Sequence, residues 1–272
     1  MVSDFTGHID DNNVFKQSFR LSAFDCTRYN VADLVWYLQI MQEIASTHSE
    51  FLDLGAAELN EKGLEWVILR NIIEVNRYAK WKEVVHLETW AHHKYKLFFP
   101  RTIVGYDDEG NKLFESTSFW AMLNRKRNFR PIPPKPYLDL YGYPSNEEDS
   151  KAPDYPAKIS IDEDDKLITN RTVSSIYDDI DVNMHTNNIS YVRWMMSLMD
   201  DEYRNTHKVQ FIDTSWMQQT YTSDKNNVRN YSKTGSFDSS VFKFDIEKED
   251  TEGNKTISSI AKMKWETSDK LL

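Results

Sequence analysis

The chain has 272 residues, of which 40% are hydrophobic and 28% are charged. Its 33 Lys and Arg residues against 43 Asp and Glu residues give a net charge of −10, which argues against general nucleic-acid binding because that requires a basic face. Eight Trp residues and 13% aromatics exclude a disordered chain. The sequence contains no run of 18 apolar residues, so it predicts no membrane span. A single cysteine, Cys26, and a start without a basic or apolar stretch favour a cytoplasmic protein.

The first half of the chain has a helical pattern followed only by strand patterns. Asn30 is a candidate helix N-cap, and the residues after it form one apolar stripe made of Leu34, Leu38, Met41 and Ala45. Alternating residues then predict strands over 66–76, 83–93, 96–106 and 113–123. This order indicates one buried helix against an antiparallel sheet.

A proline-rich, acidic stretch separates the two halves. Seven of the eight prolines fall between positions 131 and 156, and the acidic run 162–165 follows. Proline removes backbone donors and resists regular structure. We therefore expect a first domain at 1–130, a linker at 131–165 and a second domain at 166–272.

The second half repeats the organisation of the first. Thr186 or Asn187 is a candidate N-cap, and the stripe that follows comprises Ile189, Val192, Met196 and Met199. Strands are predicted over 207–217, 226–234, 239–248 and 256–266, and the turn sequence EGNK recurs at 109–112 and 252–255. A buried helix wrapped by an antiparallel sheet, made twice, predicts an α+β tandem hot-dog fold.

One polar segment, at 179–188, stands out ahead of the second helix. Alternation places Asp181, Asn183 and His185 on one side of an extended segment, beside a helix N-terminus with free N–H groups. Carboxylate, amide and imidazole groups at such an end can polarise a carbonyl and handle a proton. The alternative is a polar turn that caps the helix and carries a surface histidine. The matching segment of the first half, 25–30, has no histidine, so any site belongs to the second half.

Several other chemistries lack their motifs. The sequence has no G-x-S-x-G, no G-x-G-x-x-G, no P-loop, no C-x-x-C and no H-E-x-x-H. We therefore expect neither a metal nor an organic cofactor.

The sequence resembles the acyl-acyl-carrier-protein thioesterases of plants and bacteria. The resemblance runs from about 15 to 266 and is carried by GLEWVILR at 63–70, RYAKW at 77–81, VVHLETW at 84–90, FWAMLN at 119–124, and the segment 179–188 followed by Tyr191. It implies a tandem hot-dog fold and hydrolysis of the thioester of fatty acyl chains on acyl carrier protein, which ends chain elongation.

The resemblance also implies roles for individual residues. Asp181, Asn183 and His185 match the Asp-x-Asn-x-His catalytic positions of the family. Asn183 and His185 are then expected to hold the thioester carbonyl and the attacking water, with Asp181 orienting or activating them. The helix N-terminus at Thr186, Asn187 and Asn188 is expected to supply oxyanion donors.

The chain departs from the family pattern on the strand after the second helix. The family has Glu there, followed in plants by Cys, whereas this chain has Gln219 and then Thr220. Gln219 can hydrogen-bond a water but cannot act as a base, so proton transfer falls to Asp181 or His185.

The only dense basic run of this acidic chain contains Arg125, Lys126 and Arg127. It is either a solvated edge of the linker or a docking site for the acidic carrier protein, since complementary charge steers encounter.

Three alternatives remain open from the sequence: an acyl-coenzyme A thioesterase, a degenerate hot-dog protein that binds acyl chains without turnover, and, more weakly, a hydroxyacyl dehydratase. A tandem chain already contains the pair of hot dogs that simpler relatives make by dimerising. A homodimer is therefore unnecessary but stays open. The sequence does not give the acyl chain length or saturation preference.

Overall fold

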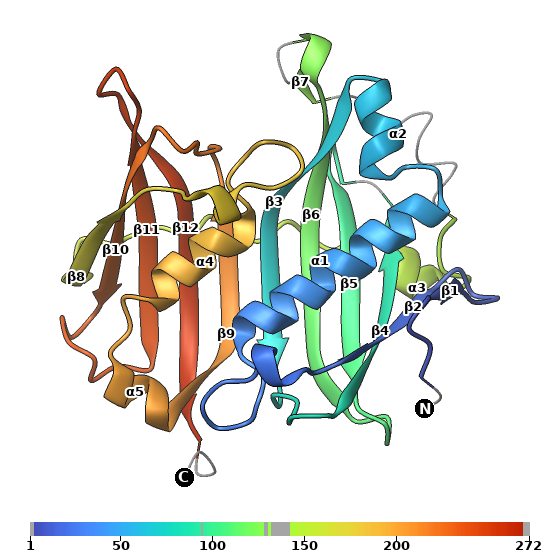
Figure 1. The fold of residues 1–272 in the computed structure, drawn as a ribbon, viewed down its shortest axis with the longest axis horizontal. Helices are drawn as coiled ribbons and strands as arrows, with labels where there is room; N and C mark the ends of the chain where they lie inside the picture. Colours follow the sequence, from blue (N-terminus) through green and yellow to red (C-terminus); the bar gives the residue numbers. More distant parts are fainter. Residues whose placement is uncertain (1–2, 94, 128–129, 132–141, 269–272) are drawn as a thin grey trace. The chain divides into compact units, whose positions relative to one another are not determined.

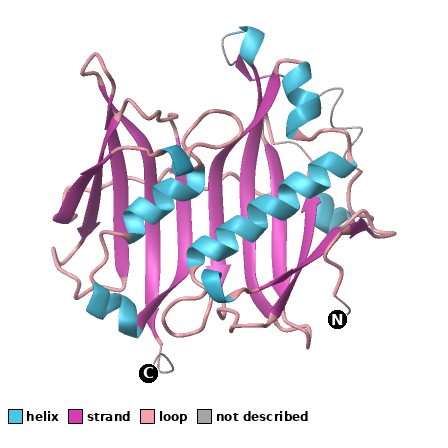
Figure 2. Cartoon of the chain, in the orientation of Figure 1, coloured by secondary structure: helices cyan, strands magenta, loops and turns pink. Residues whose placement is uncertain are grey.

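The structure is a computed structural model that describes residues 3–93, 95–127, 130–131 and 142–268 (Figure 1). Contacts within the chain divide it into two compact units, Met1–Pro156 and Ala157–Leu272. Each unit consists of an antiparallel sheet with one main helix lying on it (Figure 2). Among the helices of the described residues, none combines the length and apolar composition that a membrane crossing requires.

The first unit has a sheet in the order β1-β2-β4-β5-β6-β3, with β7 paired to β6. Its strands are β1 (His8–Ile9), β2 (Phe15–Arg20), β3 (Leu64–Val75), β4 (Val84–Ala91), β5 (Phe99–Tyr106), β6 (Lys112–Asn124) and β7 (Arg130–Pro131). Its helices are α1 (Leu34–Phe51), α2 (Ala56–Glu61) and α3 (Glu147–Ser150), with 3-10 turns η1 (Ala23–Asp25) and η2 (Arg125–Arg127).

The second unit has a sheet in the order β9-β12-β11-β10-β8. Its strands are β8 (Lys166–Val173), β9 (His207–Trp216), β10 (Lys225–Ser232), β11 (Val241–Glu249) and β12 (Lys255–Thr267). Its helices are α4 (Asn188–Met196) and α5 (Asp201–Thr206), preceded by the 3-10 turn η4 (Tyr177–Asp179). The eight strands expected from alternation are all present, within a few residues of their predicted ends.

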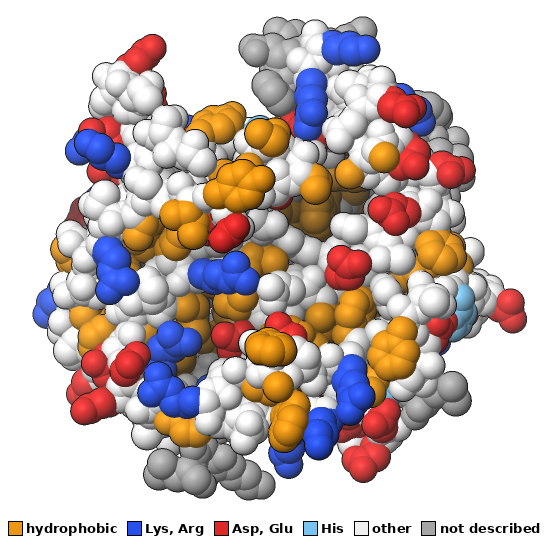
Figure 3. Space-filling view, in the orientation of Figure 1, with side chains coloured by type: hydrophobic (Ala, Val, Ile, Leu, Met, Phe, Trp, Pro, Cys, Tyr) orange, Lys and Arg blue, Asp and Glu red, His pale blue; other side chains and the backbone are white. Residues whose placement is uncertain are grey.

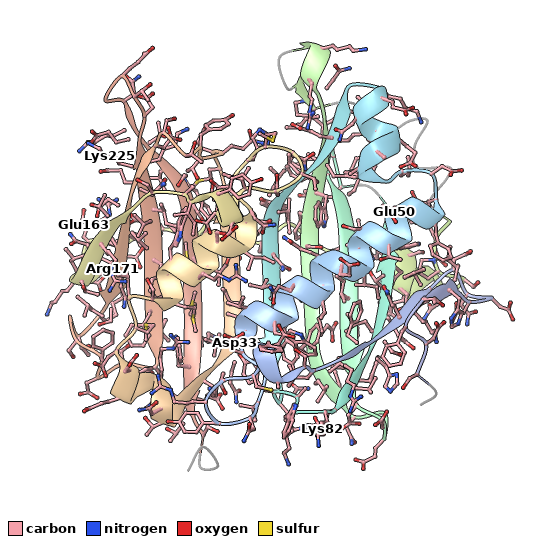
Figure 4. All side chains as sticks on the ribbon, viewed as in Figure 1. Asp33, Glu50, Lys82, Glu163, Arg171 and Lys225 are labelled. Carbon is pink, nitrogen blue, oxygen red and sulfur yellow. The ribbon has the colours of Figure 1, made fainter. Side chains whose placement is uncertain are left out.

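The central helix of the first unit begins later than the sequence suggested. Asp33, labelled in Figure 4, is the N-cap, and its carboxylate accepts the N–H of Trp36 at 3.0 Å. The expected cap, Asn30, is wrong: it has φ 59° and lies in the turn before the helix. The predicted stripe is confirmed, because all four of its residues are at most 7% exposed. Burial of each large apolar side chain contributes about 1.5–3 kcal/mol to stability.

The central helix of the second unit is capped as expected. The Asn187 side chain accepts the N–H of Ile189 at 2.9 Å. Ile189, Val192 and Met196 are buried within α4, and Met199 is buried just beyond its end. The helix covers only nine residues, whereas α1 covers 18.

The two EGNK turns have the same geometry. Asp107 donates its N–H to Asn111 O, and its carboxylate accepts the N–H groups of Glu109 and Asn111. Asp250 makes the equivalent three bonds in the second unit. Gly110 and Gly253 both have φ 85°, which favours glycine at this position. The predicted duplication of the hairpin is therefore confirmed.

Part of the expected linker packs on the first unit. The Trp90 indole donates to Asp149 O at 3.1 Å, the His93 N–H donates to Ser150 O at 2.8 Å, and the Arg70 guanidinium donates to Pro156 O at 3.0 Å. Residues 132–141 of this stretch lie outside the described residues. The domain limits 1–130, 131–165 and 166–272 stay a prediction.

Candidate active site

The polar segment ahead of α4 is a tight turn and not the extended segment that alternation predicted. The Asp181 carboxylate accepts the N–H groups of Asn183 at 2.9 Å and His185 at 3.3 Å. Asp181 also donates its N–H to His185 O at 2.9 Å, and Met184 has φ 64°. This carboxylate closes the turn because it satisfies two backbone donors at once. Val182 and Met184 are exposed, whereas the three candidate catalytic residues are half-buried.

The same backbone turn occurs in the first unit with different side chains. Thr27 donates its N–H to Val31 O at 2.8 Å, and Asn30 takes the left-handed conformation that Met184 takes in the second unit. Val31 thus stands where the second unit has His185. Both units therefore contain this turn, but only the turn of the second unit carries an imidazole, that of His185.

A buried hydroxyl network ties this turn to the segment that follows β9. Thr186 donates its N–H and its hydroxyl to Thr220 O, at 3.2 and 2.9 Å, and its hydroxyl lies 2.7 Å from Ser175 Oγ. Thr220 donates its N–H to the Tyr191 hydroxyl at 3.0 Å. All four residues are at most 6% exposed. The network therefore holds the segment that contains Gln219 and Thr220 next to the turn that contains His185 and Thr186.

Gln219 and His185 both contact one tyrosine, Tyr221, whose place in the site the sequence did not indicate. The rings of His185 and Tyr221 lie edge to face, with centroids 5.6 Å apart and planes inclined by 70°. The Tyr221 hydroxyl donates to Gln219 Oε1 at 3.4 Å. Among the described residues, the His185 imidazole makes no hydrogen bond.

The expected oxyanion donors need a correction. The backbone N–H of Thr186 is bonded to Thr220 O, and that of Asn187 is bonded to Asp179 O at 2.7 Å. These two groups are therefore not free N–H groups of the helix N-terminus, because the turn uses them. That Thr186, Asn187 and Asn188 bind substrate stays a prediction, but not through the backbone N–H groups of Thr186 and Asn187.

Tyr191 is a structural hydroxyl within the network. The pKa of Tyr191 is raised to about 12, mainly by burial and to a smaller extent by the nearby charges of Asp224 and Asp181, while the hydrogen bonds with Thr220 oppose the rise. Its hydroxyl thus stays protonated near neutral pH and serves as a fixed hydrogen-bonding group.

The basic run lies in the first unit and is not a set of three free cations. Arg125 pairs with Glu65 at 2.7 Å, and the Glu65 side chain is only 1% exposed. Lys126 is exposed, and its alkyl chain lies against Gly63, where an added Cβ would be 2.9 Å from Lys126 Cε. The Arg127 side chain lies outside the described residues. On the face drawn in Figure 3, basic side chains are interspersed with acidic ones.

Within the described part of the chain, one group of side chains has metal-ligand spacing, namely Asp162, Asp164 and Asp165. Lys243 contacts Asp162 at 2.6 Å and Asp165 at 2.7 Å, and Lys233 contacts all three carboxylates. Because two lysines already pair with the three carboxylates, the cluster is better described as an ion-pair network.

Comparison with known proteins identifies the fold. A solved acyl-ACP thioesterase from Bacteroides thetaiotaomicron has a TM-score of 0.76 at 21% identity, over 94% of this chain and 99% of that chain. The 12:0-ACP thioesterase from Umbellularia californica has a TM-score of 0.79 at 17% identity, over 94% and 98%. At these identities the likeness shows the fold alone, and it confirms the tandem hot dog.

Curated relatives are similar over most of this chain. A chloroplastic acyl-acyl-carrier-protein hydrolase of Cuphea viscosissima is 27% identical over 214 residues, which is 74% of this chain and 50% of the relative. The chloroplastic palmitoyl-acyl carrier protein thioesterase of Gossypium hirsutum is 27% identical over 196 residues, which is 69% and 48%. The chain thus spans about half the length of the curated relatives it matches.

The family itself is recognised in both halves. The acyl-ACP thioesterase N-terminal domain matches residues 12–136, and the acyl-ACP thioesterase C-terminal domain matches residues 162–267. The two matches follow each other in the family's order and together cover most of the sequence. The chain therefore belongs to the acyl-ACP thioesterase family.

Proposed function

We propose that this protein hydrolyses the thioester of fatty acyl-acyl carrier protein to free fatty acid and carrier protein. The observation that carries the proposal is the turn at 181–185, which presents a carboxylate, an amide and an imidazole in the second unit of a chain that matches the family in both halves.

In the proposed reaction, a water oxygen adds to the thioester carbonyl carbon, and the carbon–sulfur bond then breaks. Asn183 and His185 hold the carbonyl and the water, and His185 passes the water proton toward the departing sulfur. Asp181 acts mainly by orientation, because its carboxylate shapes the turn that carries both residues. Gln219 hydrogen-bonds the water and takes no proton.

Two alternatives have specific support. Gln219 in place of a carboxylate favours a protein that binds acyl chains without turnover, since it removes one candidate base. The acyl-coenzyme A thioesterase stays a candidate because the ion pair of Arg125 with Glu65 removes one cation from the surface expected to dock a carrier protein. The free Cys26 supports a reducing compartment such as the cytoplasm, although the named plant relatives are chloroplastic.

The test measures free fatty acid released by the full chain from matched acyl-carrier and acyl-coenzyme A panels. The proposal predicts release that is faster from the carrier-bound series. Faster release from coenzyme A thioesters would favour the second alternative, and acyl binding without release would favour the first.

A further inference from the structure

We propose that Lys248 is a positioning residue of the candidate active site, which holds the segment 217–224 so that Gln219 and Tyr221 face His185. This inference rests on the proposed function for its kinetic consequence, but its geometric basis is independent of the substrate.

The segment 217–224 connects β9 to β10, and Lys225, labelled in Figure 4, marks where β10 begins. It has no helix or strand of its own, so side-chain contacts determine its path. The first of these contacts is the hydroxyl network around Thr220, described above. The second involves Asp224, whose carboxylate accepts the Tyr221 N–H at 3.0 Å.

Lys248 supplies a third contact, from the far strand of the β10–β11 pair. Its ammonium donates to Gln219 O at 2.8 Å and lies 3.7 Å from Asp224 Oδ2. It also lies 5.8 Å from the centre of the Tyr221 ring. One cation therefore contacts three residues of the segment at once.

These contacts matter because they converge on Tyr221, which contacts His185, and on Gln219, which accepts the Tyr221 hydroxyl. Tyr221 has the His185 ring against it and the Lys248 ammonium near it, and its hydroxyl also bonds Gln219. The Lys248 and Asp224 side chains are only 15% and 4% exposed, so solvent screens their interaction weakly. Loss of the Lys248 ammonium would remove the cation near the buried Asp224 carboxylate and the hydrogen bond to the Gln219 carbonyl.

The hairpin β11–β12 offers a matched control. Lys255 is 58% exposed and pairs with Glu249 at 3.3 Å, on the same hairpin as Lys248. Lys248→Met and Lys255→Met remove the same charge and keep a similar chain length. Only the first should disturb the segment 217–224.

Kinetics of the full chain on an acyl-carrier substrate provide the first test. We expect Lys248→Met to lower kcat by about 10- to 100-fold, because small displacements of positioned groups have effects of this size. KM should stay within about twofold, since Lys248 binds no substrate. Lys248→Arg should restore part of kcat. In a Gln219→Ala background, Lys248→Met should have a smaller effect, because one of the two side chains that it positions is gone.

A measurement without substrate separates this inference from the proposed function. The C2 proton of His185 in the NMR spectrum senses the Tyr221 ring, so it should shift in Lys248→Met and stay unchanged in Lys255→Met. If wild type hydrolyses thioesters but both methionine variants match it in kcat and in this shift, the positioning role is wrong and the proposed function stands. If wild type hydrolyses none while the shift occurs, the positioning role stands and the proposed function fails.

Discussion

The Thr186 hydroxyl should contribute several times more to the free energy of unfolding than an ordinary surface contact does. Because it donates to Thr220 O, the Ser175 hydroxyl must donate to it across their 2.7 Å contact. Thr186→Val preserves the side-chain shape and removes both bonds. Thr220 O keeps the N–H of residue 186, at 3.2 Å, but the buried Ser175 hydroxyl loses its acceptor.

An unsatisfied buried hydroxyl costs about 1–3 kcal/mol, so we expect the variant to lose about 2 kcal/mol of unfolding free energy. Urea unfolding should show this as a lower midpoint with an unchanged slope. Thr222→Val is the control, since Thr222 is exposed in the same segment and should change stability by less than about 0.5 kcal/mol. Equal midpoints for Thr186→Val and wild type would refute the network as described.

Three further predictions concern the first unit. Arg125→Met should lower the unfolding free energy by about 1–3 kcal/mol, because it leaves the buried Glu65 carboxylate without its partner, and the double change Arg125→Met with Glu65→Gln should recover part of the loss in urea unfolding. Burial, with the charge of a neighbouring arginine, lowers the pKa of His48 from 6.5 to about 2, so between these values the unfolded state alone binds the proton. Stability should therefore fall as pH drops below 6.5, approaching about 1.4 kcal/mol per pH unit, and His48→Gln should reduce that slope in urea midpoints measured from pH 7 to 5. If Lys126 and Arg127 dock the carrier protein, changing both to Ala should raise KM for carrier-bound substrate only, and an equal loss on a small thioester would exclude docking.

Much of the fold could be predicted because its central elements carry clear periodicity. The inner strands alternate and the central helices have an apolar stripe, so their positions follow from the sequence. The edge strand β8 was missed because most of its side chains are exposed, so no apolar alternation marks it. The helices α2 and α5 span six residues each, too few for a stripe to repeat.

The site was harder to predict because its geometry depends on contacts between distant positions. The residue types at 181, 183 and 185 indicated a polar site, but alternation could not show that the Asp181 carboxylate would close the backbone into a turn. Tyr221 and Lys248 come from different parts of the second unit, and only the folded sheet brings them together. Asn30 was mistaken for a cap because its type suits a cap and a left-handed turn equally well.

The role of His185 is tested most directly by comparing free fatty acid release from acyl-carrier substrates by wild type and by His185→Ala, both verified as folded by circular dichroism. If His185 handles the proton, the variant should be slower by about 100-fold or more. Release by His185→Ala at the wild-type rate would contradict the assignment of the active site to the turn at 181–185.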